Sequence, residues 1–421
     1  MKRIIIEGNQ ILSGTINISG AKNSAVALIP AAILCDEEVT INNVPNISDI
    51  DALQEILTYL GATVKRDKNS ITIDSSKIEN KEIPEAISKK LRASYYFMSS
   101  LLGKYNYVEM YFPGGCSIGA RPIDQTLKGY RMLGANVLEE GNKFTISASK
   151  LTGSTIDLAM PSVGATVNSL LVAVKAKGTT IINNAAREPE ISNLADFLNR
   201  MGAKISGAGT SSITIEGVEH LHSAKVDVIP DRIEAGTYVI AGALVGDNLK
   251  INNIIPNHFQ SLIDKLVEMG ANILVNENNI IISKIENGNY INVKTMGFPG
   301  FATDLQQPLT TLLTQLNGVS TLEETIYENR FQNVPYLNKM GANIEINDRT
   351  IKVNGPTKLI GTTVEATDLR AGACLVLAGL SAEGTTTINK VEYVLRGYEN
   401  IIEKLANVGA KIKIEEYNEV A

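Results

Sequence analysis

One short element recurs six times along the chain and limits its fold more than any other feature. The dipeptide Gly-Ala follows a helical pattern and precedes a strand pattern each time, with its glycine at Gly61, Gly134, Gly202, Gly270, Gly341 and Gly409. Successive glycines are 73, 68, 68, 71 and 68 residues apart. A fixed period of this kind is the signature of a repeat architecture. The sequence therefore predicts six copies of one structural unit.

Each copy contains two different helices. The helix before the glycine is amphipathic, as in Leu53, Ile56, Leu57 and Leu60, and glycine is the usual left-handed residue just past such a helix. Two strands joined by a polar turn follow it. Earlier in each copy lie another strand and an apolar helix of small residues, which suits the inside of a bundle. The predicted copy is a βαβαββ-like unit.

The sixth copy is one strand short, because the chain ends a few residues after the strand pattern at 411–414. Residues 3–8, RIIIEG, closely resemble residues 212–217, SITIEG, so we expect the N-terminus to supply the missing strand. At roughly 150 residues per domain, six copies group as two domains of three. We place the break near residue 230.

Composition excludes several classes of protein. The hydrophobic residues make up 44% and the charged residues 20%, which predicts a folded chain. A net charge of −6 argues against a nucleic-acid partner. The apolar runs at 25–35 and 238–245 are too short to span a membrane, and nothing resembles a secretory signal. No obligate protein partner is evident.

The few cysteines and histidines do not form a metal site. Cys35, Cys116 and Cys374 are an odd number at wide spacing, which indicates free thiols in a reducing cytoplasm. The three histidines lack ligand spacing, and we interpret them as surface residues. Neither a P-loop nor a GxGxxG motif is present, so nucleotide hydrolysis and dinucleotide binding are not indicated.

Polar residues gather at two positions of the repeat. One is the start of the apolar helix, which holds Lys22, Asn23, Arg92, Ser162, Asp231, Arg232, Asp304, Asp368 and Arg370. The other is the loop before the amphipathic helix, which holds residues 46–51, 116–121, 187–188, 257–258, 328–330 and 396. Helix N-termini favour anions, so cations there predict a phosphate or carboxylate site. Ser162 and Asp304 also fit the ordinary pattern of N-caps.

The most specific local motif is the loop at 113–122, PGGCSIGARP. Three glycines and two prolines in ten residues indicate a shaped loop, and Arg121 follows Cys116 by five residues. Thiols near cations in such loops become reactive, whereas Cys35 and Cys374 lie in apolar runs and resemble small hydrophobic residues. Because no histidine is near in sequence, Cys116 is as suited to donating a proton as to acting as a nucleophile.

These motifs together resemble the UDP-N-acetylglucosamine 1-carboxyvinyltransferase family of enolpyruvyl transferases. The resemblance covers essentially the whole chain, and its motifs lie at 20–23, 91–94, 113–122, 161–166, 230–234, 303–304, 328–331, 368–370 and 396–398. It implies an α/β fold of two inside-out α/β barrel domains, each with threefold pseudosymmetry. The first domain is expected at 22–230, with the Cys116 loop, and the second at 1–21 plus 231–421. The active site is expected in the cleft between them.

The resemblance also implies a reaction. The family transfers the enolpyruvyl group of phosphoenolpyruvate to the 3′-hydroxyl of UDP-N-acetylglucosamine and releases phosphate through a tetrahedral intermediate. This is the first committed step of peptidoglycan synthesis, on which the cell wall, cell shape and cell division depend, and fosfomycin is the family's known inhibitor. No cofactor and no metal are implied.

The same resemblance assigns residues to roles. Cys116 is the candidate acid and Asp304 the candidate base, with Lys22 and Arg396 also catalytic. Phosphoenolpyruvate is expected to bind Lys22, Asn23, Arg121, Arg330, Arg370 and Arg396. The UDP-sugar is expected to bind Arg92, Arg121, Pro122, Ile123, Asp124, Gln125, Ser162, Val163, Gly164, Asp304 and Ile326.

One residue departs from the family pattern, since Ala302 precedes Thr303 where a proline is expected. This change concerns the position of Asp304 and leaves its carboxylate in place. Two alternatives remain at this stage. The sister enzyme that acts on shikimate 3-phosphate shares the domain plan, and a catalytically silent regulator that binds sugar nucleotides would keep the cleft. Cys116 and the segment at 162–164 favour the UDP-sugar enzyme.

Overall fold

The computed structural model describes residues 2–114, 118–120 and 122–417. Contacts between Cα atoms divide these residues into two units. The first unit comprises residues 20–114 and 122–229, and the second comprises residues 2–19, 118–120 and 230–417. Each unit has its own cluster of buried hydrophobic side chains. The chain passes from one unit to the other at residues 19–20 and 229–230, and also on either side of residues 118–120.

The first unit has three sheets around a group of helices. The sheets are β13-β3-β5-β4, β6-β8-β7 and β11-β12-β10-β9. Their strands are β3 (Glu38–Asn42), β4 (Thr63–Asp67), β5 (Ser70–Asp74), β6 (Tyr107–Tyr111), β7 (Asn136–Glu140), β8 (Lys143–Ser147), β9 (Thr155–Asp157), β10 (Thr179–Asn183), β11 (Lys204–Ser206), β12 (Ser212–Glu216) and β13 (Lys225–Asp227). The apolar helices are α1 (Lys22–Ala31), α4 (Tyr96–Tyr105) and α6 (Val163–Ala173). The amphipathic helices are α2 (Ser48–Leu60), α5 (Asp124–Met132) and α7 (Pro189–Arg200), and short helical turns are η1 (Ala32–Leu34), α3 (Glu85–Ser88) and η2 (Arg92–Tyr95).

The second unit repeats this plan. Its sheets are β15-β16-β14-β2, β17-β18-β20-β19 and β21-β22-β1-β23. Their strands are β1 (Lys2–Glu7), β2 (Thr15–Asn17), β14 (Leu249–Asn252), β15 (Ile273–Val275), β16 (Asn279–Ile282), β17 (Asn292–Lys294), β18 (Gly318–Glu323), β19 (Asn343–Asn347), β20 (Thr350–Gly355), β21 (Thr363–Glu365), β22 (Thr385–Asn389) and β23 (Ile412–Glu416). The apolar helices are α8 (Arg232–Val245), α10 (Thr303–Leu313) and α12 (Leu369–Ser381). The remaining helices are η3 (Pro256–Phe259), α9 (Gln260–Glu268), α11 (Val334–Lys339), α13 (Glu392–Leu395) and α14 (Ile401–Ala406).

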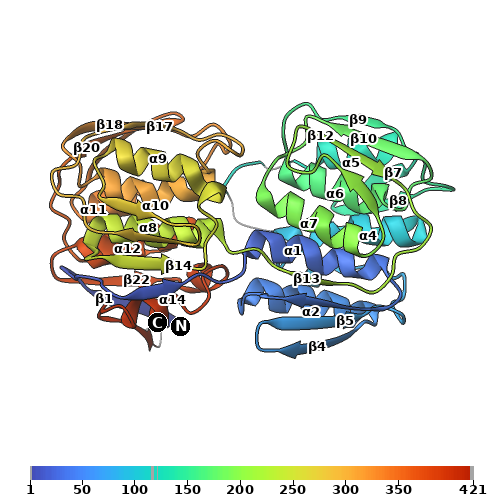
Figure 1. Cartoon of the computed structure of the whole chain (residues 1–421), viewed down its shortest axis with the longest axis horizontal. Helices are drawn as coiled ribbons and strands as arrows, with labels where there is room; N and C mark the ends of the chain where they lie inside the picture. Colours follow the sequence, from blue (N-terminus) through green and yellow to red (C-terminus); the bar gives the residue numbers. More distant parts are fainter. Residues whose placement is uncertain (1, 115–117, 121, 418–421) are drawn as a thin grey trace. The chain divides into compact units, whose positions relative to one another are not determined.

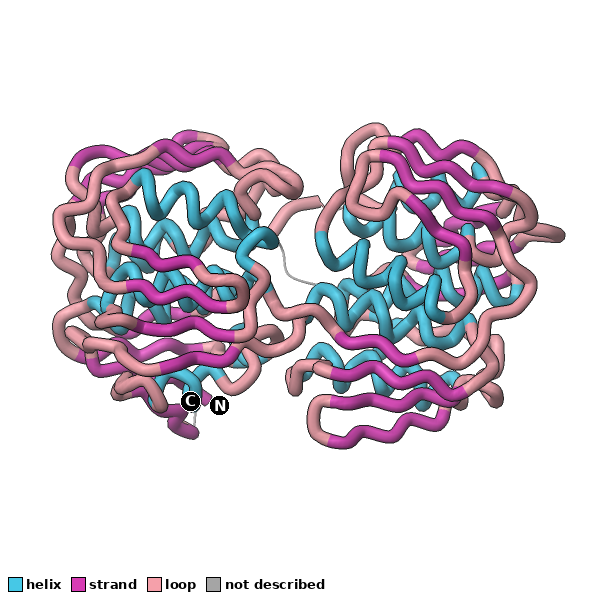
Figure 2. The backbone as a smooth tube through the Cα atoms, viewed as in Figure 1, coloured by secondary structure: helices cyan, strands magenta, loops and turns pink. Residues whose placement is uncertain are grey.

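In each unit the helices lie inside and the sheets outside (Figures 1 and 2). Helix α8 shows why, because every residue from Ile233 to Val245 is buried and most of these residues are apolar. It packs against both α10 and α12. The fold class is therefore confirmed as α/β, with two inside-out barrels built from six βαβαββ-like repeats.

The glycines that defined the repeat have the predicted conformation. All six have positive φ angles, between 92° and 106°, as a left-handed residue after a helix requires. The N-terminal segment also completes the last sheet as predicted. Strand β1 pairs antiparallel with β22, through Ile4 and Ile388, and with β23, through Ile4 and Ile414.

The repeats are less independent than the sequence pattern suggests. Strand β2 precedes α1 of the first unit, yet it pairs in parallel with β14 of the second unit's sheet. Strand β13 precedes α8 of the second unit, yet it pairs in parallel with β3 of the first. In the second repeat, a single bridge between Ile83 and Met110 stands where the other sheets have a fourth strand.

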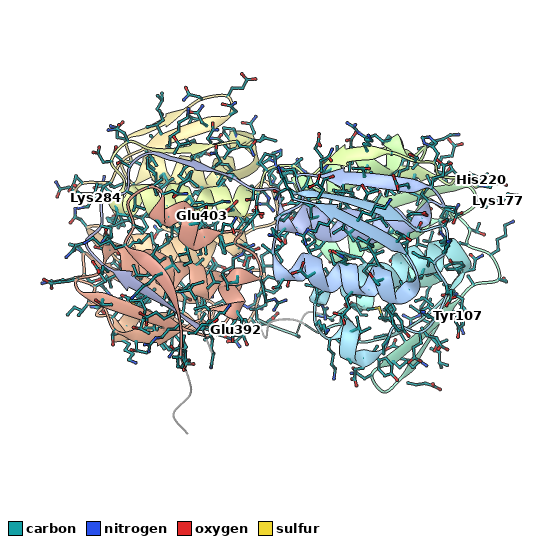
Figure 3. All side chains as sticks on the ribbon, turned by 90° about the horizontal axis from the view of Figure 1, so that it is seen from below. Tyr107, Lys177, His220, Lys284, Glu392 and Glu403 are labelled. Carbon is teal, nitrogen blue, oxygen red and sulfur yellow. The ribbon has the colours of Figure 1, made fainter. Side chains whose placement is uncertain are left out.

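Membrane-spanning helices and metal-binding clusters are both absent from the described residues. None of their helices combines the length and the apolar character that crossing a bilayer requires. They also contain no group of three histidine, cysteine or acidic side chains placed to hold a metal ion. His220 points outward from its unit (Figure 3), and His222 is exposed as well, whereas His258 is half-buried.

Candidate active site

Two arginines hold Asp304 at the start of α10. Its Oδ1 lies 2.7 Å from Nη2 of Arg330, and its Oδ2 lies 3.0 Å from Nη2 of Arg370. The arginine side chains are each 4% exposed, whereas that of Asp304 is 25% exposed. One carboxylate therefore faces two buried guanidinium groups, and the cluster carries a net positive charge.

The two arginines keep this carboxylate ionised. Desolvation favours the protonated acid, but Arg370 and Arg330 outweigh it and hold the pKa of Asp304 well below its usual range. The pKa of Arg330 is raised despite its own burial, chiefly by Asp304. While both pairs persist, Asp304 is an ionised but weak base.

Neighbouring groups fix Arg370. Its guanidinium carbon lies 5.3 Å from the ring centroid of Tyr398, a cation–π contact. Its backbone N–H is donated to Asp368, the N-cap of α12, at 2.8 Å. Asp368 in turn accepts a hydrogen bond from the Gln307 amide at 3.2 Å. Asp368 thus links Arg370 of α12 to Gln307 of α10, two helices of the second unit.

The alternative interpretation of Asp304 as an N-cap is wrong. The N-cap of α10 is Ala302, which has no side-chain cap, and Asp304 lies inside the first turn with its carboxylate on the arginines. Ser162 does cap α6, because its hydroxyl accepts the N–H of Ala165 at 3.2 Å. A capping role does not conflict with the predicted UDP-sugar contact of Ser162.

In the first unit, Lys22 begins α1 and is paired with a carboxylate. Its Nζ lies 2.9 Å from Oδ2 of Asp49, a residue of the first turn of α2 that is only 2% exposed. Asn23, next along α1, is exposed. Three of the predicted anion-binding cations, Lys22, Arg330 and Arg370, thus each pair with a carboxylate of their own unit.

Aromatic rings surround Arg92 in the same unit. Its guanidinium carbon lies 5.5 Å from the ring centroid of Tyr95 and 5.1 Å from that of Phe112. A methyl group at Gly164 would come within 1.7 Å of the Tyr95 hydroxyl, so only glycine fits there. Tyr95 therefore brings Arg92 and Gly164, two predicted UDP-sugar contacts, to one place.

A glutamine connects the start of α5 with the segment that leads into α6. The side-chain carbonyl of Gln125 accepts the backbone N–H of Ala159 at 2.7 Å and that of Met160 at 3.4 Å. Residues 159–160 come shortly before Ser162. The predicted contacts at 124–125 and 162–164 are consequently linked within the first unit.

Comparison with known proteins places this arrangement in a family. A family model described as EPSP synthase (3-phosphoshikimate 1-carboxyvinyltransferase) matches residues 6–405. UDP-N-acetylglucosamine 1-carboxyvinyltransferase 2 of Listeria monocytogenes is 49% identical over 410 residues, 97% of each chain. UDP-N-acetylglucosamine 1-carboxyvinyltransferase of Streptococcus pneumoniae is 51% identical over 418 residues, 99% of this chain and 100% of its own. The chain belongs to the UDP-N-acetylglucosamine 1-carboxyvinyltransferase family.

Solved structures agree with this assignment to the family. The enolpyruvyl transferase NikO from Streptomyces tendae superimposes with a TM-score of 0.90 at 28% identity and covers 99% of each chain. An EPSP synthase from Acinetobacter baumannii superimposes with a TM-score of 0.75 at 19% identity, over 99% of this chain and 100% of its own. At that lower identity the likeness shows the fold alone.

The remaining predicted site residues of this enolpyruvyl transferase differ in how exposed they are. Arg396 follows α13 and is half-buried, and Ile326 is 39% exposed in the turn after β18. Ile123 is buried, whereas Pro122, Asp124 and Val163 are exposed. Cys116 and Arg121 lie outside the described residues.

The structure adds residues that sequence reasoning missed. Asp49 was part of a polar loop pattern, but its pairing with Lys22 was not predicted. Tyr95 and Phe112 gave no signal, because an aromatic residue in an apolar pattern resembles core. Glu324 follows a strand and gave none either, although its carboxylate is almost fully buried.

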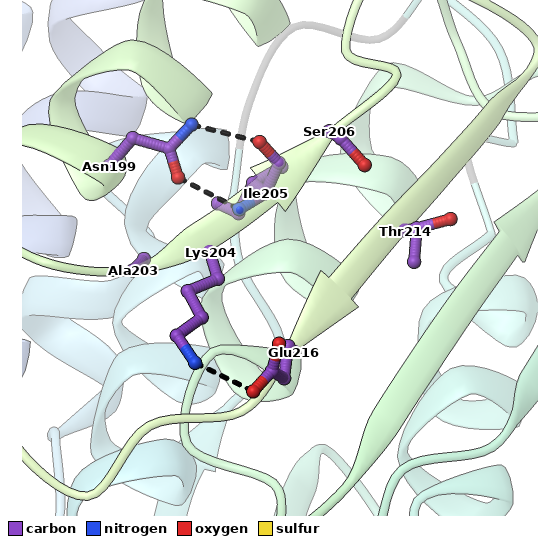
Figure 4. Close-up of a pocket in the computed structure, with 7 residues that line it drawn as sticks. All are labelled: Asn199, Ala203, Lys204, Ile205, Ser206, Thr214 and Glu216. Carbon is purple, nitrogen blue, oxygen red and sulfur yellow. Dashed lines mark hydrogen bonds and ion pairs between the residues drawn. The ribbon is translucent and has the colours of Figure 1, made fainter.

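A surface pocket in the first unit is unrelated to these clusters (Figure 4). It is lined by residues of α7, β11 and β12. The Asn199 side chain exchanges hydrogen bonds of 2.9 and 2.8 Å with the backbone of Ile205, and Lys204 pairs with Glu216 at 2.7 Å. Because these polar groups already satisfy one another, the pocket gives no indication of a ligand.

Proposed function

We propose that this chain transfers the enolpyruvyl group of phosphoenolpyruvate to the 3′-hydroxyl of UDP-N-acetylglucosamine and releases inorganic phosphate. The observation that carries the proposal is the identity of about 50% over nearly the full length to proteins that bear the name of this activity. The Asp304 cluster supports it, because a carboxylate beside two buried arginines suits a reaction with an anionic substrate.

The chemistry is an addition followed by an elimination. The 3′-hydroxyl loses its proton to Asp304, and its oxygen bonds to C2 of phosphoenolpyruvate while the methylene C3 takes a proton from Cys116. The tetrahedral intermediate then returns a proton from C3 to the Cys116 thiolate as the C2–O bond to phosphate breaks, and the leaving phosphate takes the proton held by Asp304. An ordinary thiol, with a pKa near 8.5, is mostly protonated at neutral pH and suits an acid.

The cations hold the substrate anion in this proposal. Lys22, Arg330, Arg370 and Arg396, with Asn23 and Arg121, bind the phosphate and carboxylate of phosphoenolpyruvate. An anion that competes for Arg330 and Arg370 weakens their hold on Asp304 and so raises its pKa. Asp304 becomes an effective base only when phosphoenolpyruvate is bound, so the sugar hydroxyl loses its proton only when both substrates are present.

The remaining groups bind the UDP-sugar. They are Arg92, Arg121, Pro122, Ile123, Asp124, Gln125, Ser162, Val163, Gly164, Asp304 and Ile326. We place the reaction in the cytoplasm at the first committed step of peptidoglycan synthesis. The described cysteines, Cys35 and Cys374, are free and buried, which fits a reducing compartment.

One assay tests the proposal. The purified protein is given phosphoenolpyruvate with UDP-N-acetylglucosamine in one reaction and with shikimate 3-phosphate in another, and phosphate release is followed. We expect release only with the UDP-sugar. Release only with shikimate 3-phosphate would identify the sister activity, which the family model's description makes the second candidate. Binding of the UDP-sugar without release in either reaction would indicate a silent regulator.

A further inference from the structure

A buried glutamate, Glu324, lies directly after β18 and is 1% exposed. Its Oε1 accepts the backbone N–H of Ile326 at 2.8 Å, the N–H of Tyr327 at 3.2 Å and the Thr295 hydroxyl at 3.0 Å. Its Oε2 accepts the Thr303 hydroxyl at 2.8 Å. Because a carboxylate has about four acceptor sites, these donors occupy it within the protein. Glu324 is thus suited to organising its neighbours rather than to reacting.

The Thr303 hydroxyl connects Glu324 to the arginine cluster. It donates its only proton to Glu324 and accepts Nη1–H of Arg330 at 3.1 Å. The other terminal nitrogen of Arg330, Nη2, donates to Asp304 at 2.7 Å. A guanidinium group is planar and rigid, so a contact at Nη1 determines the direction of Nη2. The chain of contacts therefore orients the pair formed by Arg330 and Asp304.

The same carboxylate shapes the turn that carries Ile326. Two backbone N–H groups of this turn point at Glu324 Oε1, and Thr295, which also donates to that oxygen, accepts the N–H of Thr325 at 2.8 Å. Ile326 itself is 39% exposed. A fixed turn presents this apolar side chain outward in one defined position.

We propose that Glu324 and Thr303 are positioning residues. Through its hydrogen bonds, the one buried carboxylate of Glu324 holds two parts of the active site in place. The Thr303 contact aligns Arg330 and Asp304 for the proton transfer from the sugar hydroxyl. The Thr295 contact and the backbone N–H groups hold the Ile326 turn for the UDP-sugar. The proposal rests on the proposed function and deepens it by assigning residues that touch neither substrate.

Two threonine substitutions separate the two contacts. Thr303→Val keeps the side-chain shape and removes the hydroxyl, and we expect kcat to fall roughly tenfold or more with little change in KM for the UDP-sugar. Thr303→Ser restores the hydroxyl and is expected to restore kcat. Thr295→Val removes the other hydroxyl from the same carboxylate, and it is expected to raise KM for the UDP-sugar while kcat stays near that of the parent.

Neighbouring glutamates provide the matched control. Glu323 is paired with Lys294 at 3.0 Å on the surface, and both side chains are about half-exposed. Glu323→Gln should leave both kinetic constants unchanged, whereas Glu324→Gln should change both. If Glu324→Gln does not fold, the threonine variants still decide the matter. Equal losses in Thr303→Val and Thr295→Val that follow their melting temperatures, with no rescue by Thr303→Ser, would overturn the proposal.

A second readout separates this proposal from the proposed function. Inorganic phosphate is used as a probe of the arginine cluster, and the rise in melting temperature that it causes is measured for the parent, Thr303→Val and Thr303→Ser. We expect a smaller rise in Thr303→Val alone. This result would support the positioning role even if the parent released no phosphate with UDP-N-acetylglucosamine. An equal rise in all three proteins would contradict it.

Discussion

Asp304 combines two demands at the scale of a single residue, since it neutralises buried arginines and is the proposed base. Asp304→Asn keeps the shape and removes the charge. We expect turnover to fall by a factor on the order of 10² to 10⁴, because the proton acceptor is lost, while binding of the UDP-sugar stays detectable. Steady-state kinetics and calorimetric titration with the UDP-sugar measure the two effects. Near-normal turnover would remove Asp304 from the mechanism.

The same variant has a second consequence, for stability. Arg330 and Arg370 would be left buried without their shared carboxylate, which costs roughly 3–5 kcal/mol of folding free energy. Inorganic phosphate should therefore raise the melting temperature of Asp304→Asn by more than that of the parent. A parent that gained as much from phosphate would show that the ion binds elsewhere.

Asp49 and Asp51 allow a matched comparison, because both lie in the first turn of α2. Asp49 is buried and holds Lys22, whereas the Asp51 side chain is 65% exposed and pairs with Arg66. We expect Asp49→Asn to raise KM for phosphoenolpyruvate about tenfold, since Lys22 loses a carboxylate that fixes its ammonium group. Asp51→Asn should match the parent, because exposed ion pairs contribute little. Equal KM values in the two variants would contradict a positioning role for Asp49.

At the scale of elements, Glu234 joins α8 and α14 to the N-terminal segment. It is 2% exposed, lies 2.5 Å from Nζ of Lys404 and accepts the Ser19 N–H at 2.8 Å. Burial raises the pKa of Glu234 from its ordinary value of 4.5 to about 7, although Lys404 opposes this shift and Asp231 adds to it. The folded protein therefore keeps a proton that the unfolded chain has already lost above pH 5.

This difference predicts how stability depends on pH. Because the folded state binds more protons, the free energy of unfolding should fall as the pH rises from about 4.5 through 7, by roughly 3 kcal/mol from this group alone. Glu234→Gln cannot ionise, so its decline over the same range should be smaller by about that amount. Urea denaturation at several pH values measures both slopes. Identical slopes would mean that Glu234 is ionised throughout.

The start of each apolar helix shows where sequence patterns lose accuracy. A mainly apolar pattern is clear only from about Gly236 and Leu309 onward, whereas α8 begins at Arg232 and α10 at Thr303. The first turns carry polar residues such as Asp304, which interrupt the apolar pattern. The helices continue through them because the backbone N–H groups at that end need no partner within the helix. The polar first turns are also the turns that hold candidate site residues.

At the scale of the whole molecule, the two units differ in how much of the chain each needs. Residues 20–229 contain every strand of the first unit's three sheets. The second unit takes β1 and β2 from the N-terminus, with Ile4, Ile6 and Ile16 at most 1% exposed. Without these three buried isoleucines, the second unit loses on the order of 5 kcal/mol of folding free energy, which is comparable to the net stability of a domain.

We therefore expect a fragment of residues 20–229 to unfold cooperatively, as a domain does. A fragment of residues 230–421 should not, unless residues 1–19 are attached to it. Circular dichroism during urea denaturation compares the fragments. Cooperative unfolding of residues 230–421 alone would show that β1 and β2 are dispensable.

The sequence by itself determined the repeat, the family, and the use of the N-terminal strand to complete the last sheet. These features are local, since a helix period, a left-handed glycine and an alternating strand each depend on a few neighbouring residues. Tertiary structure alone decided which charges meet. Arg330 and Arg370 are 26 and 66 residues from Asp304, and the exchange of β2 and β13 joins still more distant segments. Such pairs depend on how helices of different repeats pack together, and packing between repeats leaves no period in the sequence.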